Sequence, residues 1–257
     1  MRIPKLHSWD LTPTEAVALQ RELAERINTR QPLKKCGLIA GADCSYSRGS
    51  PRFYAAVVVL RTSDWSIVEA QGVVGESPFP YIPGLLSFRE VPIVLQVFKK
   101  LEHRPDAVMC DGQGYAHPRR VGLACHLGLW LGIPCFGCAK TRLVGDHDEP
   151  GLEAGAFATL HDKGEIIGNV VRTKHKTKPV YVSAGHLIDL KSATKWTLEC
   201  CNGYRIPEPT RQAHLHVNQM RLRDRSEPEA SAKKATFFAH ASGSDISAHQ
   251  PQPAARD

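Results

Sequence analysis

The sequence predicts an α/β fold in which a central mixed β-sheet is flanked by helices, with the element order βββαβαβ. Three apolar, β-branched segments separated by short turns occupy residues 38–74, which is typical of an antiparallel meander. Short apolar runs at residues 107–110 and 134–137 then alternate with segments whose apolar residues recur at helical spacing. These runs are expected to extend the meander into a mixed sheet.

A first helix is predicted ahead of the sheet. Thr12 is the expected N-cap, Pro13 fits the first helical position, and Glu15 completes a capping box. Val17 and Leu23 then lie on an apolar face of this helix.

Periodicity and turn residues place the other elements. Strands are predicted at residues 38–45, 53–60, 67–74, 107–110 and 134–137. Helices are predicted at residues 88–98, 121–131, 192–201 and 209–223. Two more strands, expected to pair, are predicted at residues 165–171 and 179–182.

Composition indicates a globular domain with a basic surface. The chain has 257 residues, of which 42% are hydrophobic and 23% are charged, enough to bury a substantial core. We expect one domain over residues 1–225. From 226 to 257 the composition shifts to Ser, Ala, Gln, Pro and His without periodicity, so this tail is expected to be disordered. The net charge of +7 favours an anionic partner, with nucleic acid the leading candidate.

The eight cysteines lie mostly in apolar runs, a pattern expected of a reducing cytoplasmic compartment. Residues 1–5 lack the apolar core of a signal peptide, and no apolar segment is long enough for a membrane span. Cys135 and Cys138 form a C-x-x-C, but no second pair has zinc-site spacing. We therefore favour buried strand-end thiols over a metal or redox pair.

Asp43 and Asp111 are the candidate metal ligands. Asp43 lies in an apolar strand, where a charge is costly unless it is paired or bound to a metal. Asp111 follows the apolar run 107–110. If the first and fourth strands are parallel neighbours, the two carboxylates project together as hard ligands for Mg²⁺ or Mn²⁺. The alternatives are a surface aspartate at a strand end and a common Asp-Gly turn.

Glu90 is the candidate third carboxylate, leaning over the edge of the sheet. Its spacing from Ser87 also fits a capping box at a helix start, and spacing alone favours that alternative.

His117, Arg119 and Lys140 are candidates for phosphate contact. Lys140 follows a short strand, where a cation can neutralise transition-state charge. His214 lies on the predicted last helix. The alternative for each is an exposed or structural side chain. The basic run at residues 172–178 is either a phosphate contact or a solvated hairpin tip.

Pro80, Tyr81, Ile82 and Pro83 form a stiff, apolar loop. Prolines fix the backbone, and minor-groove proteins insert such wedges between base steps. The alternative is a loop packed over the core.

Together these segments resemble the endonuclease V family of deoxyinosine-directed repair nucleases. The resemblance covers roughly residues 10–223, and so many separated matches make chance agreement implausible. The matching motifs are Gly41-x-Asp43-x-Ser45, Pro80-Tyr81-Ile82-Pro83-Gly84-x-Leu86-x-Phe88-Arg89-Glu90, Asp111-Gly112-x-Gly114-x-x-His117-Pro118-Arg119, Gly137-x-Ala139-Lys140 and Tyr204-Arg205-x-Pro207-Glu208-Pro209-Thr210-Arg211. The departures are Cys138, where valine is common, and the tail.

The resemblance implies a ribonuclease-H-like fold and a divalent metal, usually Mg²⁺ with Mn²⁺ as a substitute, at Asp43 and Asp111. Glu90 then belongs to the same catalytic cluster, and His214 completes it. The resemblance also implies that two further catalytic residues lie near the scissile phosphate, namely His117 and Lys140.

The same resemblance assigns residues to DNA and lesion binding. Tyr81 matches the wedge residue, and the main chain at the glycines is expected to read the hypoxanthine edge, since glycine leaves backbone atoms exposed. The residues so assigned are Pro80, Tyr81, Ile82, Pro83, Gly84, Arg89, Gly112, Arg119 and Gly137.

The implied function is that of a DNA repair endonuclease, monomeric and independent of membranes. Such an enzyme nicks DNA at the second phosphodiester bond 3′ to deoxyinosine and leaves the lesion in place. The alternatives are an inosine-specific endoribonuclease and a non-catalytic inosine-binding protein. Another nuclease of this fold, such as a Holliday-junction resolvase, is expected to lack the wedge.

Overall fold

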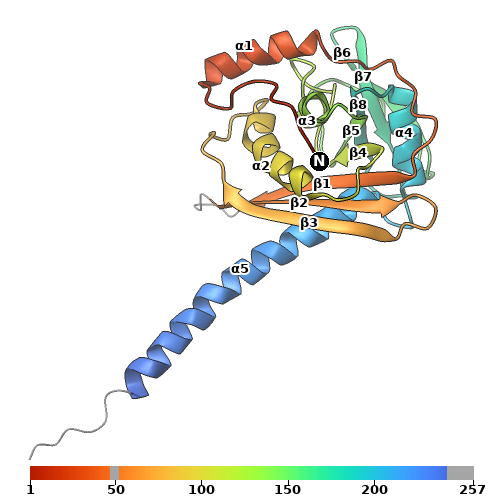
Figure 1. Cartoon of the computed structure of the whole chain (residues 1–257). Helices are drawn as coiled ribbons and strands as arrows, with labels where there is room; N and C mark the ends of the chain where they lie inside the picture. Colours follow the sequence, from red (N-terminus) through yellow and green to blue (C-terminus); the bar gives the residue numbers. More distant parts are fainter. Residues whose placement is uncertain (47–51, 242–257) are drawn as a thin grey trace, which may run out of the picture. The chain divides into compact units, whose positions relative to one another are not determined.

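The sheet at the centre of the molecule has eight strands in the order β3-β2-β1-β4-β5-β8-β7-β6 (Figure 1). The computed structural model describes the backbone of residues 1–46 and 52–241, and side chains as far as residue 224. The strands are β1 (Leu38–Tyr46), β2 (Arg52–Arg61), β3 (Ile67–Glu76), β4 (Ala107–Cys110), β5 (Cys135–Ala139), β6 (Phe157–Asp162), β7 (Glu165–Val171) and β8 (Val180–His186). The helices are α1 (Pro13–Ala24), α2 (Leu86–Lys100), α3 (Leu123–Leu131), α4 (Leu190–Glu199) and α5 (Glu208–Ala241).

Strand pairing confirms the predicted mixed sheet and the order βββαβαβ. Strands β1, β2 and β3 form an antiparallel meander. Strand β4 pairs in parallel with the other edge of β1, and β5 pairs in parallel with β4. Strands β8, β7 and β6 continue the sheet in antiparallel pairs. Sequence reasoning does not place β6, because its segment FATLHD mixes apolar and polar residues too briefly to show a period.

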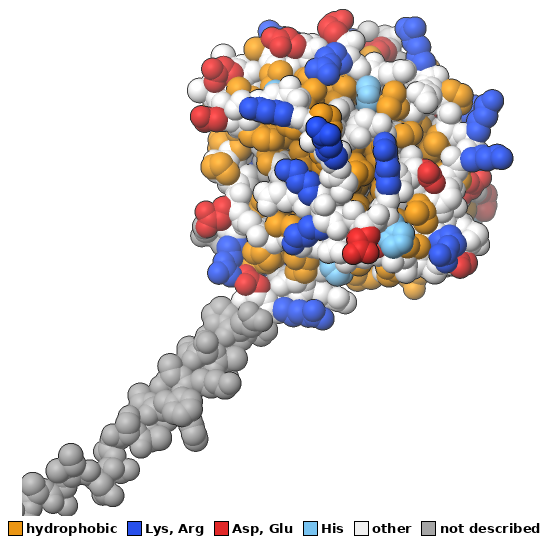
Figure 2. All heavy atoms as spheres, viewed as in Figure 1, with side chains coloured by type: hydrophobic (Ala, Val, Ile, Leu, Met, Phe, Trp, Pro, Cys, Tyr) orange, Lys and Arg blue, Asp and Glu red, His pale blue; other side chains and the backbone are white. Residues whose placement is uncertain are grey.

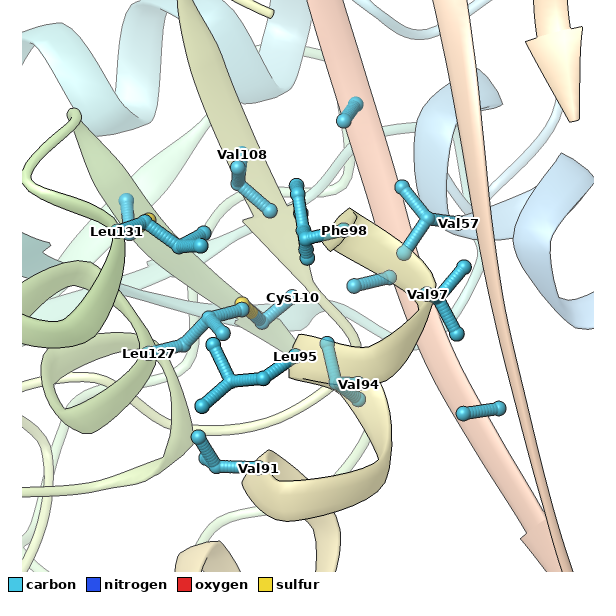
Figure 3. Close-up of a cluster of buried hydrophobic side chains, with 14 of the residues drawn as sticks. Val57, Val91, Val94, Leu95, Val97, Phe98, Val108, Cys110, Leu127 and Leu131 are labelled. Atoms are coloured by element: carbon cyan, nitrogen blue, oxygen red, sulfur yellow. The ribbon is translucent and has the colours of Figure 1, made fainter. Parts of the chain in front are cut away.

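The core consists of two layers because side chains alternate across the sheet. Val57 and Val59 of β2 pack on the face covered by α2 and α3, while Val58 and Leu60 pack on the face covered by α4. Figure 3 shows the first layer, in which side chains of α2 and α3 meet those of the strands. Burial of both faces explains why β2 reads as a continuous apolar run.

The two predicted capping boxes have opposite outcomes. At α1, the Thr12 hydroxyl accepts from the Glu15 backbone N–H at 3.3 Å, and the Glu15 carboxylate accepts from the Thr12 backbone N–H at 2.7 Å, which confirms the first box. At α2, the residue before the helix is Leu85, without a side-chain cap. Ser87 lies inside the helix, with its hydroxyl 3.0 Å from His126 Nδ1. The cap alternative for Glu90 is therefore wrong.

Helix α5 is seated against β1 through a backbone contact. A Cβ atom at Gly41 would lie 1.8 Å from the Pro209 carbonyl oxygen, so only glycine permits this approach. The side chains of Thr210 and Ala213 are buried beside it. This contact fixes the first turn of α5 two positions along β1 from Asp43.

The last helix is longer than the predicted segment 209–223, because α5 ends at Ala241. Residues 229–235, EASAKKA, are rich in Glu, Ala and Lys, which favour a helix, and they lie in the segment expected to be disordered. Residues 242–257 of that tail lie outside the described residues. The chain divides into two units, Met1–Met220 and Arg221–Asp257. The boundary of the catalytic domain at residue 225 stays a prediction.

Two further sequence predictions concern thiols and membranes. Cys135 and Cys138 are both buried in β5, but they belong to opposite faces of the sheet, so they do not form a ligand or redox pair. Among the described residues, no helix combines the length and apolar character that a membrane span requires.

Candidate active site

Asp43 and Asp111 lie side by side at one end of the parallel strand pair. Ala42 of β1 is in register with Cys110 of β4, so the aspartate that follows each of them occupies the same sheet edge. The Asp111 backbone N–H donates to the Ala42 carbonyl oxygen at 3.1 Å and extends the ladder by one residue. Their side chains are only 10% and 12% exposed. The predicted meeting of the two carboxylates is confirmed.

His214 joins them from the start of α5. Its Nδ1 lies 2.8 Å from Asp43 Oδ2, and its Nε2 lies 3.0 Å from the Asn218 side-chain amide. One ligand atom from each of Asp43, Asp111 and His214 lies within 4.8 Å of the others. Two hard carboxylate oxygens and an imidazole nitrogen at this spacing suit a divalent cation.

The electrostatics of the acidic cluster favour a cation. Burial, and then the charge of Asp111, raise the pKa of Asp43 to about 6. Burial, and then the charges of Asp43 and Asp111, raise the pKa of Glu90 to about 8. Glu90 extends from α2, is 8% exposed, and is near enough to both aspartates for their charges to raise its pKa, but it is not one of the three grouped ligand residues, so its predicted catalytic role stays a prediction. Lys140 supplies positive charge through an ion pair with Asp111.

A cavity of about 470 Å³ opens beside this cluster. One wall is the loop predicted to be a wedge, and the opposite wall is the segment after β5. Asp111 and Lys140 belong to both the cavity and the cluster. The lining residues are Tyr81, Ile82, Pro83, Gly84, Leu86, Ser87, Asp111, Gly112, Gln113, His117, Val121, Gly122, Leu123, Ala139, Lys140, Thr141, Arg142 and Leu143. Tyr81 projects from the loop and is 60% exposed.

The loop is anchored at Gly84, whose φ of +79° lies in the left-handed region. Its carbonyl oxygen accepts from three side chains: Gln20 at 3.0 Å, His117 at 3.0 Å and Arg119 at 2.8 Å. A Cβ at Gly84 would lie 2.8 Å from the Arg119 guanidinium. The anchor therefore requires glycine and ties the end of this loop to α1 and to the segment after β4.

His117 and Arg119 support the loop rather than project beside the three ligands. His117 Nδ1 accepts from the Arg119 backbone N–H at 3.2 Å, so Nε2 carries the proton donated to Gly84. Burial, and then the charge of Arg119, lower the pKa of His117 to about 4 and keep the ring neutral. The predicted role of His117 near the scissile phosphate stays a prediction.

Sequence reasoning missed Gln20, which is fully buried on α1. Its amide donates to Gly84 and Val121, both at 3.0 Å, and its carbonyl accepts from Arg119 Nε at 2.6 Å. A glutamine at an apolar helical position was the available signal, but its partners lie 64 to 101 residues away. Nothing local in the sequence identifies them.

Two of the predicted glycines sit at close backbone approaches. A Cβ at Gly137 would lie 2.4 Å from the Gly112 carbonyl oxygen, and a Cβ at Gly112 would lie 3.1 Å from Leu123. Between these walls, Gln113 donates to the Thr141 carbonyl at 2.9 Å. Gly112 lines the cavity, whereas Gly137 lies in β5 outside its lining, and the two glycines let the segment after β4 pack closely against β5.

Arg89 lies apart from the groups just described. Its guanidinium carbon is 4.9 Å from the centre of the Tyr46 ring and 5.2 Å from that of Phe53, within the range of cation–π attraction. Its predicted contact with DNA stays a prediction.

Comparison with known proteins places these features in a wider group. A family model described as Endonuclease V matches residues 21–215. The chain is 49% identical over 220 residues to a protein from Dehalococcoides mccartyi (strain CBDB1) named Endonuclease V, covering 86% of this chain and 99% of that one. A protein of the same name from Myxococcus xanthus (strain DK1622) is 47% identical over 222 residues, covering 86% of this chain and 94% of that one.

Solved structures agree with the fold. The crystal structure of the Endonuclease V from Streptomyces avermitilis is 39% identical, with a TM-score of 0.81, and covers 85% of this chain and 96% of that one. That of Ciona intestinalis Endonuclease V, in complex with a 24mer DNA containing an inosine followed by a ribo-adenosine, is 26% identical, with a TM-score of 0.72 over 82% of this chain and 97% of that one. The ribonuclease-H-like fold implied by the sequence is confirmed.

Proposed function

This chain belongs to the endonuclease V family, and on that premise we propose that it is a nuclease that cleaves DNA containing deoxyinosine. The proposal includes a nick at the second phosphodiester bond 3′ to the lesion, Mg²⁺ as the metal with Mn²⁺ as a substitute, and action as a monomer. The Ciona intestinalis relative bound to inosine-containing DNA supports the choice of substrate.

The observation that carries the proposal is the shared wall between cavity and acidic cluster. Asp111 and Lys140 line the 470 Å³ cavity and also form the ion pair at the cluster. When a base occupies the cavity, the sugar–phosphate backbone of its strand therefore lies beside the carboxylates. Such a volume lies in the usual range of ligand pockets.

Recognition of the base depends on the loop at residues 80–83 and on backbone atoms of the cavity wall. Tyr81 and Ile82 stand between two prolines at the mouth of the cavity and are suited to fill the gap left by a rotated base. Unstacking costs least for a poorly paired base such as inosine. Backbone atoms around Gly84 and Gly112, which line the cavity, would supply hydrogen bonds that fit the hypoxanthine carbonyl and mismatch the adenine amino group.

The residues at the cluster fit a divalent cation. Burial, and then the charge of Asp111, raise the pKa of Asp43, and a cation between the two carboxylates would relieve that cost. Asp43, Asp111 and His214 would hold it. Bound there, Mg²⁺ supplies a Lewis acid for a phosphate oxygen and lowers the pKa of a water molecule.

The protein's own groups then position the phosphate. Lys140 Nζ, which pairs with Asp111, holds positive charge where phosphate oxygens gain negative charge during cleavage. Asn218 fixes the orientation of His214 through its hydrogen bond to Nε2.

The decisive test is a nicking assay on a duplex with one deoxyinosine, with Mg²⁺ or with EDTA. We expect a single metal-dependent nick, located by product length at the second bond 3′ to the lesion, and none on the matched deoxyadenosine duplex. A nick at another bond would refute the position, and equal cleavage in EDTA would refute the metal.

Two alternatives are decided in the same assay. Faster cleavage of a matched RNA with one inosine would identify an endoribonuclease. Tight binding of the inosine duplex without a nick in Mg²⁺ or Mn²⁺ would identify a non-catalytic binding protein. Equilibrium sedimentation of the chain with and without the duplex tests whether it acts as a monomer.

A further inference from the structure

A second groove, of about 520 Å³, lies next to the base cavity and shares Lys140, Thr141 and Arg142 with it. Its other wall is the connection between β7 and β8, including Lys176 and Lys178. We call the groove lined by Lys140, Arg142, Lys176 and Lys178 the basic groove. It begins at the cation that pairs with Asp111 and leads away from the acidic cluster.

Arg172 organises the loop that forms the far wall. Its side chain is 5% exposed and pairs with Glu149 at 2.6 Å. It also donates to the carbonyl oxygens of Gly151 at 2.7 Å and Pro150 at 2.9 Å, and to that of Thr177. Its charge is therefore satisfied inside the protein, and Glu149 does not neutralise the groove.

Arg205 joins this loop to the strand that bears Lys140. Its guanidinium donates to the carbonyl oxygens of Lys178 at 2.6 Å and Pro179 at 2.9 Å, with a longer contact of 3.4 Å to that of Lys140. The Arg205 side chain thus links the two sides of the basic groove through their backbone carbonyl oxygens.

The lysines of the loop are left available. Lys174, Lys176 and Lys178 are exposed, and no carboxylate within residues 1–46 or 52–224 pairs with them. Lys176 has a φ of +55°, which a bulky residue seldom adopts, and its backbone N–H donates to the Leu152 carbonyl at 3.0 Å. This hydrogen bond ties the tip of the loop to the segment before β6, so the exposed lysines project from an anchored backbone.

Arg142 adds a fourth cation that is only weakly neutralised. Its partner, Asp146, lies 3.1 Å away but is 97% exposed, and such surface pairs contribute little. Figure 2 shows basic side chains spread over the visible face of the molecule, which fits a protein that approaches a polyanion.

We propose that the basic groove binds the phosphodiester backbone of the nucleic acid beside the cleavage centre, with Lys176 and Lys178 as its distal contacts. The proposal rests on the proposed function, since the bound strand is the one whose base enters the cavity. Phosphates are the ligands that suit unpaired lysines along a fixed track, and their recognition does not depend on sequence.

Salt dependence of binding tests the proposal without any cleavage. The full chain is titrated, in EDTA, with a fluorescein-labelled deoxyinosine duplex at NaCl concentrations from about 50 to about 300 mM. We expect the double variant K176Q/K178Q to weaken binding on the order of tenfold at about 50 mM NaCl and to lower the slope of log K against log salt by about 1 to 2. The matched variant K34Q/K35Q removes the same charge at two exposed lysines outside both cavities and should bind as the wild type does.

Each outcome decides the proposal. An unchanged affinity and slope for K176Q/K178Q would overturn it, as would an equal loss in K34Q/K35Q, which would point to overall charge alone. Equal melting temperatures of the three proteins confirm that the fold is intact. Absence of nicking by the wild type in Mg²⁺ would count against the proposed function while leaving the binding result valid.

Discussion

The acidic cluster and the loop anchor at Gly84 are held in opposite ways. At the cluster, burial and mutual repulsion raise the pKa of Asp43 to about 6 and that of Glu90 to about 8. At the anchor, one carbonyl oxygen accepts three hydrogen bonds, and the supporting Gln20 is fully buried with both polar atoms of its side chain hydrogen-bonded. A cation would relieve the repulsion within the cluster, whereas the hydrogen bonds of the anchor are already made. Substitutions at the cluster should therefore impair cleavage, and substitutions at the anchor should impair binding of the lesion.

The largest expected effect is that of a substitution at Asp111, which should abolish cleavage but leave binding of the lesion largely intact. The substitution Asp111→Asn removes a charge that a divalent cation needs, so the nicking rate should fall by at least about 10³-fold. Binding of the deoxyinosine duplex in EDTA should stay within a few-fold of wild type, because the anchor is untouched. Undiminished cleavage by this variant would remove Asp111 from the metal site.

The next effect concerns the exposed tip of the wedge. Tyr81→Ala should lower nicking of a deoxyinosine duplex by about tenfold or more, since the tip no longer fills the gap in the stack. Nicking of a single-stranded oligonucleotide with the same lesion should change little, because no partner strand has to be separated. An equal loss on both substrates would mean that Tyr81 does not act as a wedge.

The anchor itself is tested at Gln20. Gln20→Met keeps the apolar volume but leaves Arg119 Nε and the Val121 carbonyl without their partner, at a cost of about 1–3 kcal/mol in the free energy of unfolding. The looser loop should weaken binding of the lesion duplex several-fold, which fluorescence titration measures. Gln96→Met, at an exposed position of α2, is the matched control and should alter neither quantity. Wild-type binding by Gln20→Met would show that the wedge needs no such support.

The smallest effect is a pH dependence of stability in EDTA. Folding raises the pKa of Glu90 from its ordinary value of 4.5 to about 8, so the folded state binds more protons than the unfolded state between these values. The free energy of unfolding should therefore fall as the pH rises through that window, and the melting temperature should fall with it, by on the order of 10 °C. Glu90→Gln should flatten the dependence. A melting temperature that rises across the same window in the wild type would contradict the assignment.

The sequence predicted the parts of the site that follow from strand order. Asp43 and Asp111 each end an apolar run, and the βββαβ order makes those runs neighbours, so local pattern alone brought the two carboxylates together. The stiff loop at residues 80–83 could be predicted because proline fixes its own backbone, while its role as a wedge stays a prediction. Lys140 followed for the same reason as the aspartates, at the end of the next parallel strand.

What the sequence could not supply are contacts between distant segments. Gln20 and Asn218 look like ordinary helical polar residues, and their roles appear only when α1 and α5 dock on other elements. Ser87 and Glu90 show the converse error. Their spacing fits a capping box, but the helix begins earlier, at Leu86. The Ser87 hydroxyl lies beside His126, and Glu90 lies near the two aspartates instead.

The contact of Gly41 with Pro209 has a consequence for the order in which the protein is made. His214 follows Asp43 by 171 residues, and it reaches the acidic cluster only when the first turn of α5 seats on Gly41. Since chains fold as they emerge from the N-terminus, both carboxylates are in place well before their third partner is synthesised. A nascent or prematurely ended chain thus lacks one of the three proposed metal ligands, so under the proposed function cleavage requires the finished domain.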